Sequence, residues 1–296
     1  MRLGAAFWDG APTAEPQRTI DRLGEIGIKG AWLNYTSEEG WPEEEVQSCL
    51  AAFDAAGVFV GAIACLHFQL LSHADAAVRQ RGVEAVMRCI RDSSVLCAQC
   101  ISIHWRPGGA EDWWSDECFN RIVRSSEPVF AEAERVGIDI GFHSHPLCPW
   151  DSPAQHRRLA DEVKSPRCKV LLDPVNMMTA RATKTSTDFL NHMFDLIGDI
   201  VAGAHAKDVL LDEAHWVVKV DEVPPGAGTM DYETFLRRLG ELDPDLVLTI
   251  AHLRDVGVAG TNGSPVYVTY GETFWEFKRA RMFIQEVASR VGVEAV

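Results

Sequence analysis

The stretch GIDIGFHSH, Gly137–His145, shows the pattern that decides the fold. It begins with a glycine, continues with strand-forming residues and ends in polar side chains. Successive side chains of a β-strand point to opposite faces, so Ile140 and Phe142 are expected to face a layer of helices. His143 and His145 are then expected to point to the other side. The stretch therefore predicts a buried strand that carries reactive groups at its carboxyl end.

Similar runs recur along the chain, and amphipathic stretches separate them. The eight predicted strands are Leu3–Trp8, Ile28–Asn34, Val58–Leu66, Gln99–His104, Ile138–His143, Lys169–Asp173, Ile200–His205 and Leu246–Ala251. Helix starts are indicated at Pro42, Ser72 and Asp231, and a last helix over Thr273–Val291 is expected to pack against the first. Strands that alternate with helices predict a parallel sheet. Eight such units predict a (β/α)₈ TIM barrel, formed as a single domain over residues 1–296.

The longest connection follows the seventh strand and runs from Lys207 to Met230. Within it, Trp216–Val223 is predicted to be a short extended segment across the barrel mouth. Long loops at the carboxyl ends of barrel strands usually serve the site.

Charge and hydropathy exclude two kinds of partner. The net charge is −15, the sequence pI is near 5.1, and lysines and arginines form no cluster, so nucleic acid is not expected. The longest apolar stretch, Val58–Leu71, is interrupted by His67 and Gln69 and is too short for a membrane span. Met1–Gly10 lacks the apolar core of a signal peptide.

Cysteine usage favours a reducing compartment. The eight cysteines are scattered, and Cys97 and Cys100 form a lone CxxC, which we interpret as two thiols buried in a strand. A cytoplasmic protein is therefore expected. A homo-oligomer is compatible with the sequence.

Histidine placement singles out one end of the barrel. Five of the ten histidines fall at or just past the carboxyl ends of predicted strands, where barrel active sites lie. They are His67, His104, His143, His205 and His252.

His143, Asp173 and His205 end three neighbouring strands and are expected to converge. Two imidazoles and a carboxylate suit Zn²⁺, Mn²⁺, Fe²⁺ or Co²⁺. Taken singly, Asp173 could equally cap a turn and His205 could be an ordinary core histidine. Lys207 follows His205 by two positions and is expected to share its face.

The order of four short motifs resembles the xylose isomerase-like TIM barrel superfamily. They are Gly137–His145, Leu172–Asn176, His205–Asp208 and Pro224–Gly228. That group contains sugar and sugar-phosphate isomerases and epimerases, inosose dehydratases and family 2 apurinic endonucleases. The resemblance covers most of the chain. It implies a divalent metal held by Glu, Asp, His and Glu at the ends of strands five to eight, with the two Glu residues often acting as acid and base.

Two of the implied ligands match this sequence and two do not. Asp173, in Asp-Pro-Val-Asn, and His205, in His-Ala-Lys-Asp, stand at the Asp and His positions. His143 stands at the fifth-strand Glu, Ala251 at the eighth-strand Glu, and Asn176 where many members have a second His.

These departures leave two interpretations. In one, His252, His145 or His104 completes a histidine-rich metal site; in the other, the metal is lost and the barrel only binds its ligand. We favour the first, because Asp173, His205 and several further histidines remain together.

The resulting hypothesis is a metal-dependent isomerase or epimerase in sugar metabolism, which acts on a small-molecule sugar or polyol derivative through an enediolate. The expected metal ligands are His143, Asp173, His205 and His252. Catalytic roles are expected for His143 or His145 as base and for Lys207 as an electrostatic helper.

Substrate contacts are expected from residues near the ends of strands four and six. They are His104, Trp105, Arg106 and Asn176. Tryptophans stack well on sugar rings and arginine binds carboxylate or phosphate, although Trp105, Trp113 and Trp114 could equally be buried aromatics that hold a loop.

Two other functions stay open. The first is a metal-dependent lyase, dehydratase or hydrolase, which needs only one acid or base. The second is a non-catalytic sugar-binding barrel or accessory subunit. The acidic charge and the reduced carboxylate set disfavour an endonuclease.

Overall fold

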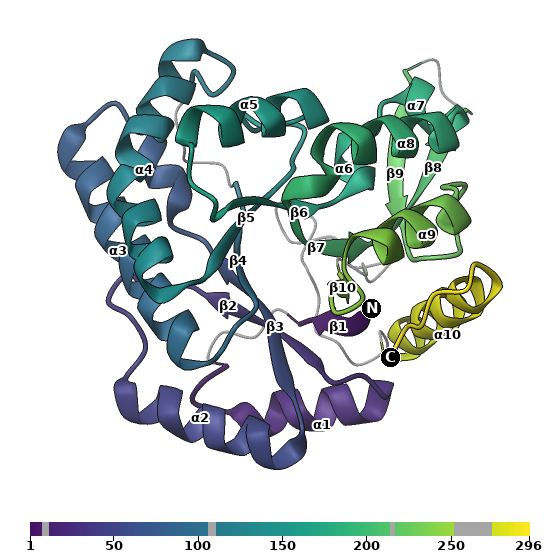
Figure 1. Cartoon of the computed structure of the whole chain (residues 1–296), viewed down its shortest axis with the longest axis horizontal. Coiled ribbons are helices and arrows are strands. Elements are labelled where there is room, and N and C mark those ends of the chain that lie inside the picture. The colour runs from purple at the N-terminus through teal and green to yellow at the C-terminus, as the bar shows by residue number, and fades with distance from the viewer. Residues whose placement is uncertain (8–11, 106–110, 214–216, 252–273) are drawn as a thin grey trace.

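Eight parallel strands close into a barrel, and helices cover its outside (Figure 1). The computed structural model describes residues 1–7, 12–105, 111–213, 217–251 and 274–296. Neighbouring strands follow the order β1, β10, β7, β6, β5, β4, β3, β2. Their bounds are β1 Arg2–Ala6, β2 Gly30–Tyr35, β3 Phe59–Cys65, β4 Cys100–Ile103, β5 Asp139–His143, β6 Cys168–Leu172, β7 Val201–Ala206 and β10 Val247–Ile250. The predicted (β/α)₈ TIM barrel is confirmed, and each of its strands overlaps the predicted one.

The helices that link successive strands form the outer layer. They are α1 Pro16–Ile26, α2 Glu43–Ala56, α3 Ala76–Val95, α4 Asp116–Val136, α5 Pro153–Val163, α6 Pro174–Met177, α7 Ala180–Lys184, α8 Ser186–Ile197, α9 Tyr232–Leu242 and α10 Phe274–Arg290, with short 3₁₀ helices η1 Phe68–Ser72 and η2 Gly198–Ile200. Helix α10 packs against α1 as expected, with Lys278 3.4 Å from Glu25. Among the described helices, none combines the length and apolar character of a membrane span.

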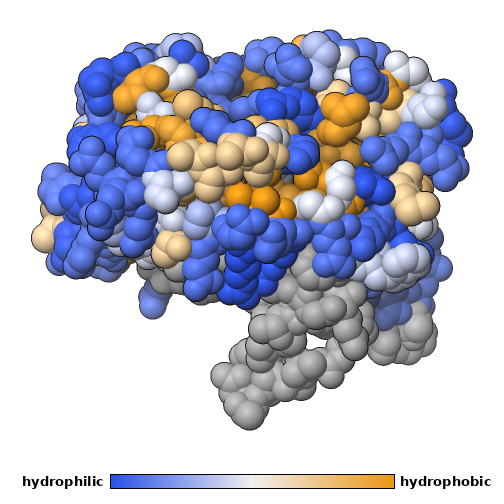
Figure 2. All heavy atoms as spheres, turned by 90° about the horizontal axis from the view of Figure 1, so that it is seen from below, coloured by the Kyte–Doolittle hydropathy of each residue, from blue (hydrophilic) through white to orange (hydrophobic). Residues whose placement is uncertain are grey.

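The core has two parts because alternate side chains of each strand point inward and outward. Outward-facing residues such as Ile140 and Phe142 join the large core beneath the helices, as expected. The lumen holds a smaller cluster of mostly small side chains around Trp32, including Ala62, Ala64 and Ala251. The helices turn their polar sides to solvent, and the face shown in Figure 2 is mostly hydrophilic with some apolar groups near its middle.

A two-stranded antiparallel hairpin follows β7 directly. Its strands are β8, Asp208–Asp212, and β9, Lys219–Val223, and it lies beside α7 and α8 (Figure 1). The extended segment predicted near Trp216–Val223 corresponds to β9, whereas β8 was not anticipated. Trp216 itself lies outside the described residues.

Three local predictions need correction. Asp75, not Ser72, caps α3: its carboxylate accepts from the Ala77 backbone N–H at 2.7 Å, while Ser72 ends η1. Pro42 is the residue before α2 and not its first residue. Cys97 is exposed in a turn with φ of 52°, so only Cys100 of the CxxC is buried.

Candidate metal and substrate site

Three side chains from neighbouring strands meet at the carboxyl end of the barrel. His143 ends β5, Asp173 follows β6, and His205 lies on β7. One potential ligand atom from each lies within 4.8 Å of the other two, and all three residues are buried. His143 Nε2 lies 2.7 Å from Asp173 Oδ2, and His205 Nδ1 lies 3.4 Å from the same oxygen. The structure therefore brings together the trio expected from the sequence.

The position of Asp173 follows from the proline after it. Strand β6 stops at Leu172 and Pro174 opens α6, so Asp173 becomes the residue that caps this helix. Its Oδ1 accepts from the backbone N–H of Asn176 at 3.2 Å, while Oδ2 points into the cluster. The capping role and the cluster role, considered as alternatives from the sequence, are both fulfilled by this one side chain.

Lys207 supplies the positive charge of the cluster. Its side chain is 1% exposed, and its Nζ contacts Asp173 Oδ2 at 2.8 Å, Glu222 Oε2 at 2.9 Å and Asn176 Oδ1 at 3.2 Å. An ammonium group has three N–H donors, so these three acceptors match its capacity. Two carboxylates thus surround one ammonium group, and the cluster keeps an excess of negative charge.

Burial sets the protonation of the two histidines. It lowers the pKa of His143 to about 3, against the raising effect of the hydrogen bond to Asp173, and it also lowers the pKa of His205. Burial acts to raise the pKa of Asp173, but Lys207 and the two histidines hold it well below its usual value. Asp173 and Glu222 likewise raise the pKa of Lys207 despite its burial. At neutral pH the trio is therefore two neutral imidazoles and an ionised carboxylate.

This donor set fits a divalent cation. Neutral imidazoles and a carboxylate are the forms that bind Zn²⁺, Mn²⁺, Fe²⁺ and Co²⁺, and three protein ligands leave a position open for substrate. His143, Asp173 and His205 are the residues that would hold the ion. Ala251, at the end of β10, is 1% exposed and has no ligand atom in its side chain.

Aromatic rings support the imidazoles from the side. His104 stacks on His143 with ring centroids 4.4 Å apart and 24° between the planes. The ring centroid of Trp32 lies 4.8 Å from that of His205 and 5.6 Å from that of His104, which it meets edge-on. His104, expected as a substrate contact, therefore lies directly beside the trio.

His145 lies in the loop after β5 and not on the strand. Strand β5 ends at His143, as predicted, so the expected alternation does not extend to His145, which is half-buried in the following loop. Its Nδ1 accepts from the Leu147 backbone N–H at 3.1 Å, so the neutral imidazole carries its proton on Nε2. Burial and the nearby Lys207 lower the pKa of His145.

The remaining predicted residues are distributed differently. Asn176 lies in the site, where its Nδ2 donates to the Ser144 carbonyl at 2.8 Å. Trp105 is buried edge-on against Trp150 at 5.5 Å, which agrees with a packing role. Arg106 and His252 lie outside the described residues.

Two residues near the site were missed from the sequence. Glu222 on β9 contacts Lys207. In the sequence, the one feature that could have pointed to it is its place as a charged residue within the predicted extended segment Trp216–Val223. Trp150 is fully buried and its indole N–H donates to the His143 carbonyl at 2.9 Å, which fixes the end of β5. No sequence pattern pointed to this contact.

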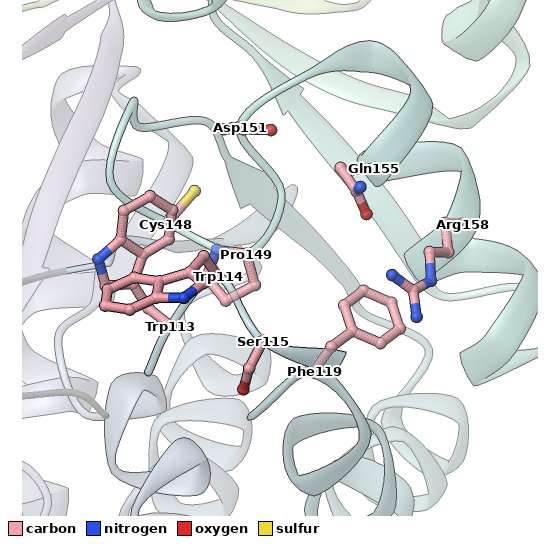
Figure 3. A pocket seen from close by; sticks show the side chains of 9 residues that line it. All are labelled: Trp113, Trp114, Ser115, Phe119, Cys148, Pro149, Asp151, Gln155 and Arg158. Carbon is pink, nitrogen blue, oxygen red and sulfur yellow. The ribbon is translucent and has the colours of Figure 1, made fainter. Parts of the chain in front are cut away.

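Trp113 and Trp114 line a separate cavity of about 100 Å³ between the start of α4 and the loop before α5 (Figure 3). The Arg158 guanidinium lies 4.0 Å from the centre of the Phe119 ring at this cavity. None of the lining residues belongs to the His–Asp–His cluster.

A family comparison agrees with this fold. Residues 20–260 match the model of the family described as the xylose isomerase-like TIM barrel. The chain belongs to this family. The resemblance inferred from the sequence motifs is therefore confirmed. A search of curated proteins found no match.

Solved structures of low identity share the fold along their whole length. D-Psicose 3-epimerase from Clostridium cellulolyticum H10, solved with D-tagatose, is 15% identical, with 99% of this chain and 98% of that chain covered and a TM-score of 0.72. A second D-psicose 3-epimerase, in the presence of D-fructose, is 17% identical, with coverages of 99% and 100% and a TM-score of 0.72. The probable 3-DHS dehydratase AsbF from Bacillus anthracis is 12% identical, with coverages of 98% and 99% and a TM-score of 0.68.

Proposed function

We propose that this xylose isomerase-like barrel is a metal-dependent enzyme that isomerises or epimerises a small sugar or a sugar derivative. The observation that carries the proposal is the convergence of His143, Asp173 and His205 on one point at the carboxyl end of the barrel. Family membership and the epimerases among the structural neighbours support the sugar as substrate class.

The cluster suits a reaction in which a proton moves next to a carbonyl group. When bound, a divalent cation would act as a Lewis acid on the carbonyl and its neighbouring hydroxyl. Lys207 uses its three N–H groups on protein acceptors, so its part is to hold Asp173 ionised and to orient Asn176. His143 is likewise engaged with Asp173, which makes His145 the better placed histidine for proton transfer to a substrate oxygen.

A dehydratase or other lyase is the second candidate. The trio contains a single carboxylate, and Ala251 adds no acid or base at the end of β10. Elimination of water needs one group to remove a proton and a Lewis acid to assist the leaving hydroxyl, so it tolerates this reduced set. The dehydratase among the neighbours supports the same reading.

Metal analysis followed by solvent exchange tests these proposals. Protein purified without chelator is expected to contain about one equivalent of a divalent metal, and Asp173→Ala is expected to lose it. The metal-loaded enzyme is then incubated in D₂O with D-psicose, D-tagatose, D-fructose and L-ribulose. Deuterium in recovered substrate, in an isomeric aldose or in an epimeric ketose, detected by NMR, supports isomerisation or epimerisation, whereas a dehydrated product supports the lyase.

The non-catalytic alternative predicts a different result. A sugar-binding barrel would show no stoichiometric metal and no exchange, and Asp173→Ala would leave sugar binding intact. That combination would remove both enzyme proposals.

A further inference from the structure

Glu222 is a charged residue on the inner face of the β8–β9 hairpin. In the antiparallel register Glu222 pairs with Val209, and paired residues project from the same face. Val209 is fully buried, and Val220, two residues before Glu222, packs against the main core. Asp221 projects from the opposite face and forms an ion pair with Lys219 at 2.5 Å. The hairpin therefore directs Glu222, and not its acidic neighbour, towards the barrel.

The base of the hairpin is held firmly, which fixes where Glu222 lies. The buried Asp208 carboxylate accepts four backbone N–H groups, at 2.8 to 3.1 Å, from residues 209, 226, 228 and 230. The Tyr232 hydroxyl donates to the Lys207 carbonyl at 2.6 Å, directly before the hairpin begins. A carboxylate carried by this hairpin is thus preorganised against the cluster.

Glu222 differs from the rest of the cluster in its access to solvent. Its side chain is 17% exposed, against 1% for Lys207 and 0% for Asp173, and its Oε2 lies 2.9 Å from Lys207 Nζ. Asp173 Oδ2 already contacts His143 Nε2 and Lys207 Nζ at hydrogen-bonding distance, so it has little capacity left for a substrate proton. Among the described residues in contact with Lys207, Glu222 is the carboxylate that a ligand in the mouth of the barrel can reach.

We propose that Glu222 is a catalytic residue that carries the proton in this reaction. This inference rests on the proposed isomerase or epimerase function and assigns a role within it. The C–H bond next to the substrate carbonyl breaks, its proton goes to a Glu222 oxygen, and the electron pair moves to the carbonyl oxygen to give an enediolate. Return of this proton from Glu222 to the adjacent carbon, while the hydroxyl proton on that carbon passes to the neighbouring oxygen, completes isomerisation and restores the Glu222 carboxylate without an oxidant. Return to the same face of the original carbon only exchanges its hydrogen, so epimerisation needs a second group that delivers a proton to the opposite face.

A structural role for Glu222, limited to neutralising Lys207, makes different predictions for two variants. Glu222→Gln keeps the size and an oxygen acceptor for Lys207 but cannot take up a proton. Glu222→Asp keeps the carboxylate but shortens the side chain by one methylene group, so the carboxylate lies farther from the substrate. Asp221→Asn on the opposite face of the same strand is the matched control, because it removes an acid that points away from the cluster.

The experiment measures deuterium incorporation into the fastest-exchanging ketose of the panel by the metal-loaded wild type and each variant. We expect Glu222→Gln to slow exchange by about 10²- to 10⁴-fold, Glu222→Asp to slow it less, and Asp221→Asn to leave it within about twofold. With the same sugar deuterated at the exchanging carbon, the kinetic isotope effect should rise in Glu222→Gln, since proton removal becomes the slowest step. Metal content and unfolding midpoint should stay close to those of the wild type.

Several results would overturn the inference while leaving the proposed function intact. Glu222→Gln could exchange at nearly the wild-type rate, or Glu222→Asp could be the slower of the two. Loss of metal or of stability in parallel with the rate would assign Glu222 a structural role. A wild type that binds metal but exchanges no sugar of the panel would instead overturn the proposed function, and the role of Glu222 with it.

Discussion

Asp173→Asn probes the centre of the site, because three neighbours converge on one oxygen of this side chain. Its Oδ2 lies 2.7 Å from His143 Nε2, 2.8 Å from Lys207 Nζ and 3.4 Å from His205 Nδ1. An amide of the same shape removes the charge and leaves Lys207 buried with one anionic partner instead of two. The amide oxygen can take the place of Oδ1 and keep the cap of α6, so the NH₂ group then stands at the Oδ2 position and faces Lys207 and His143.

The loss of charge dominates the cost. Removing one partner of a buried ion pair costs about 3–5 kcal/mol, whereas the cap of α6 is retained because asparagine caps helices as well as aspartate does. Because Glu222 still contacts Lys207, we expect the lower part of this range, a total destabilisation of about 3–4 kcal/mol. A metal at 100 times its dissociation constant adds about 2.7 kcal/mol to the wild type, and the variant is expected to gain little of this.

Urea unfolding followed by circular dichroism measures both quantities, with EDTA in one series and excess Mn²⁺ or Zn²⁺ in the other. Asp221→Asn, an equivalent change on the outer face of the hairpin, serves as the control and should behave like the wild type. A cost below about 1 kcal/mol in EDTA would show that Asp173 does not hold the buried charges together. An undiminished gain in stability from metal would show that the ion binds elsewhere.

Three further substitutions test the surroundings of the site and the outer layer. Trp150→Phe removes the N–H that bonds to the His143 carbonyl and should destabilise the fold by about 1–3 kcal/mol in chemical denaturation. Gly228→Ala would place a methyl group 2.3 Å from an oxygen of Asp208, so we expect a loss of about 1–3 kcal/mol and slower turnover as the hairpin shifts. Hydrogen bonds from two arginines lower the pKa of Glu132 to about 2 from its ordinary 4.5, so its contribution is present above pH 4.5 and is lost as the pH falls towards 2. Glu132→Gln should therefore be less stable by about 1 kcal/mol at pH 7, after allowance for solvent screening, and its thermal unfolding should approach that of the wild type in acid.

The barrel and the trio could be predicted because their signals are local. Each buried strand is a short apolar run, and a polar residue at its end must lie at the rim once the sheet is parallel. His143, Asp173 and His205 each end such a run, and adjacency of the three strands then brings them together. The alternation of side chains along a strand gave a wrong expectation for His145, because β5 ends two residues before it.

The hairpin and its carboxylate could not be predicted for a physical reason. Strand β8 begins two residues after β7 ends, so the sequence shows one continuous run where the chain leaves the barrel. Glu222 gains its position from pairing with Val209 thirteen residues earlier and from the four N–H groups gathered by Asp208. Such contacts depend on a turn whose geometry the residue types alone do not determine.

In the described part of the chain, Trp32 is the one large aromatic side chain in the small cluster that fills the lumen. It is 3% exposed and stands among small side chains such as Ala62 and Ala64, directly against His205. This indole ring therefore fills much of the space that the small side chains around it leave. A shorter apolar side chain there would open room beneath the imidazoles, and protein engineers could use that room to admit longer carbon chains without touching the outer helices.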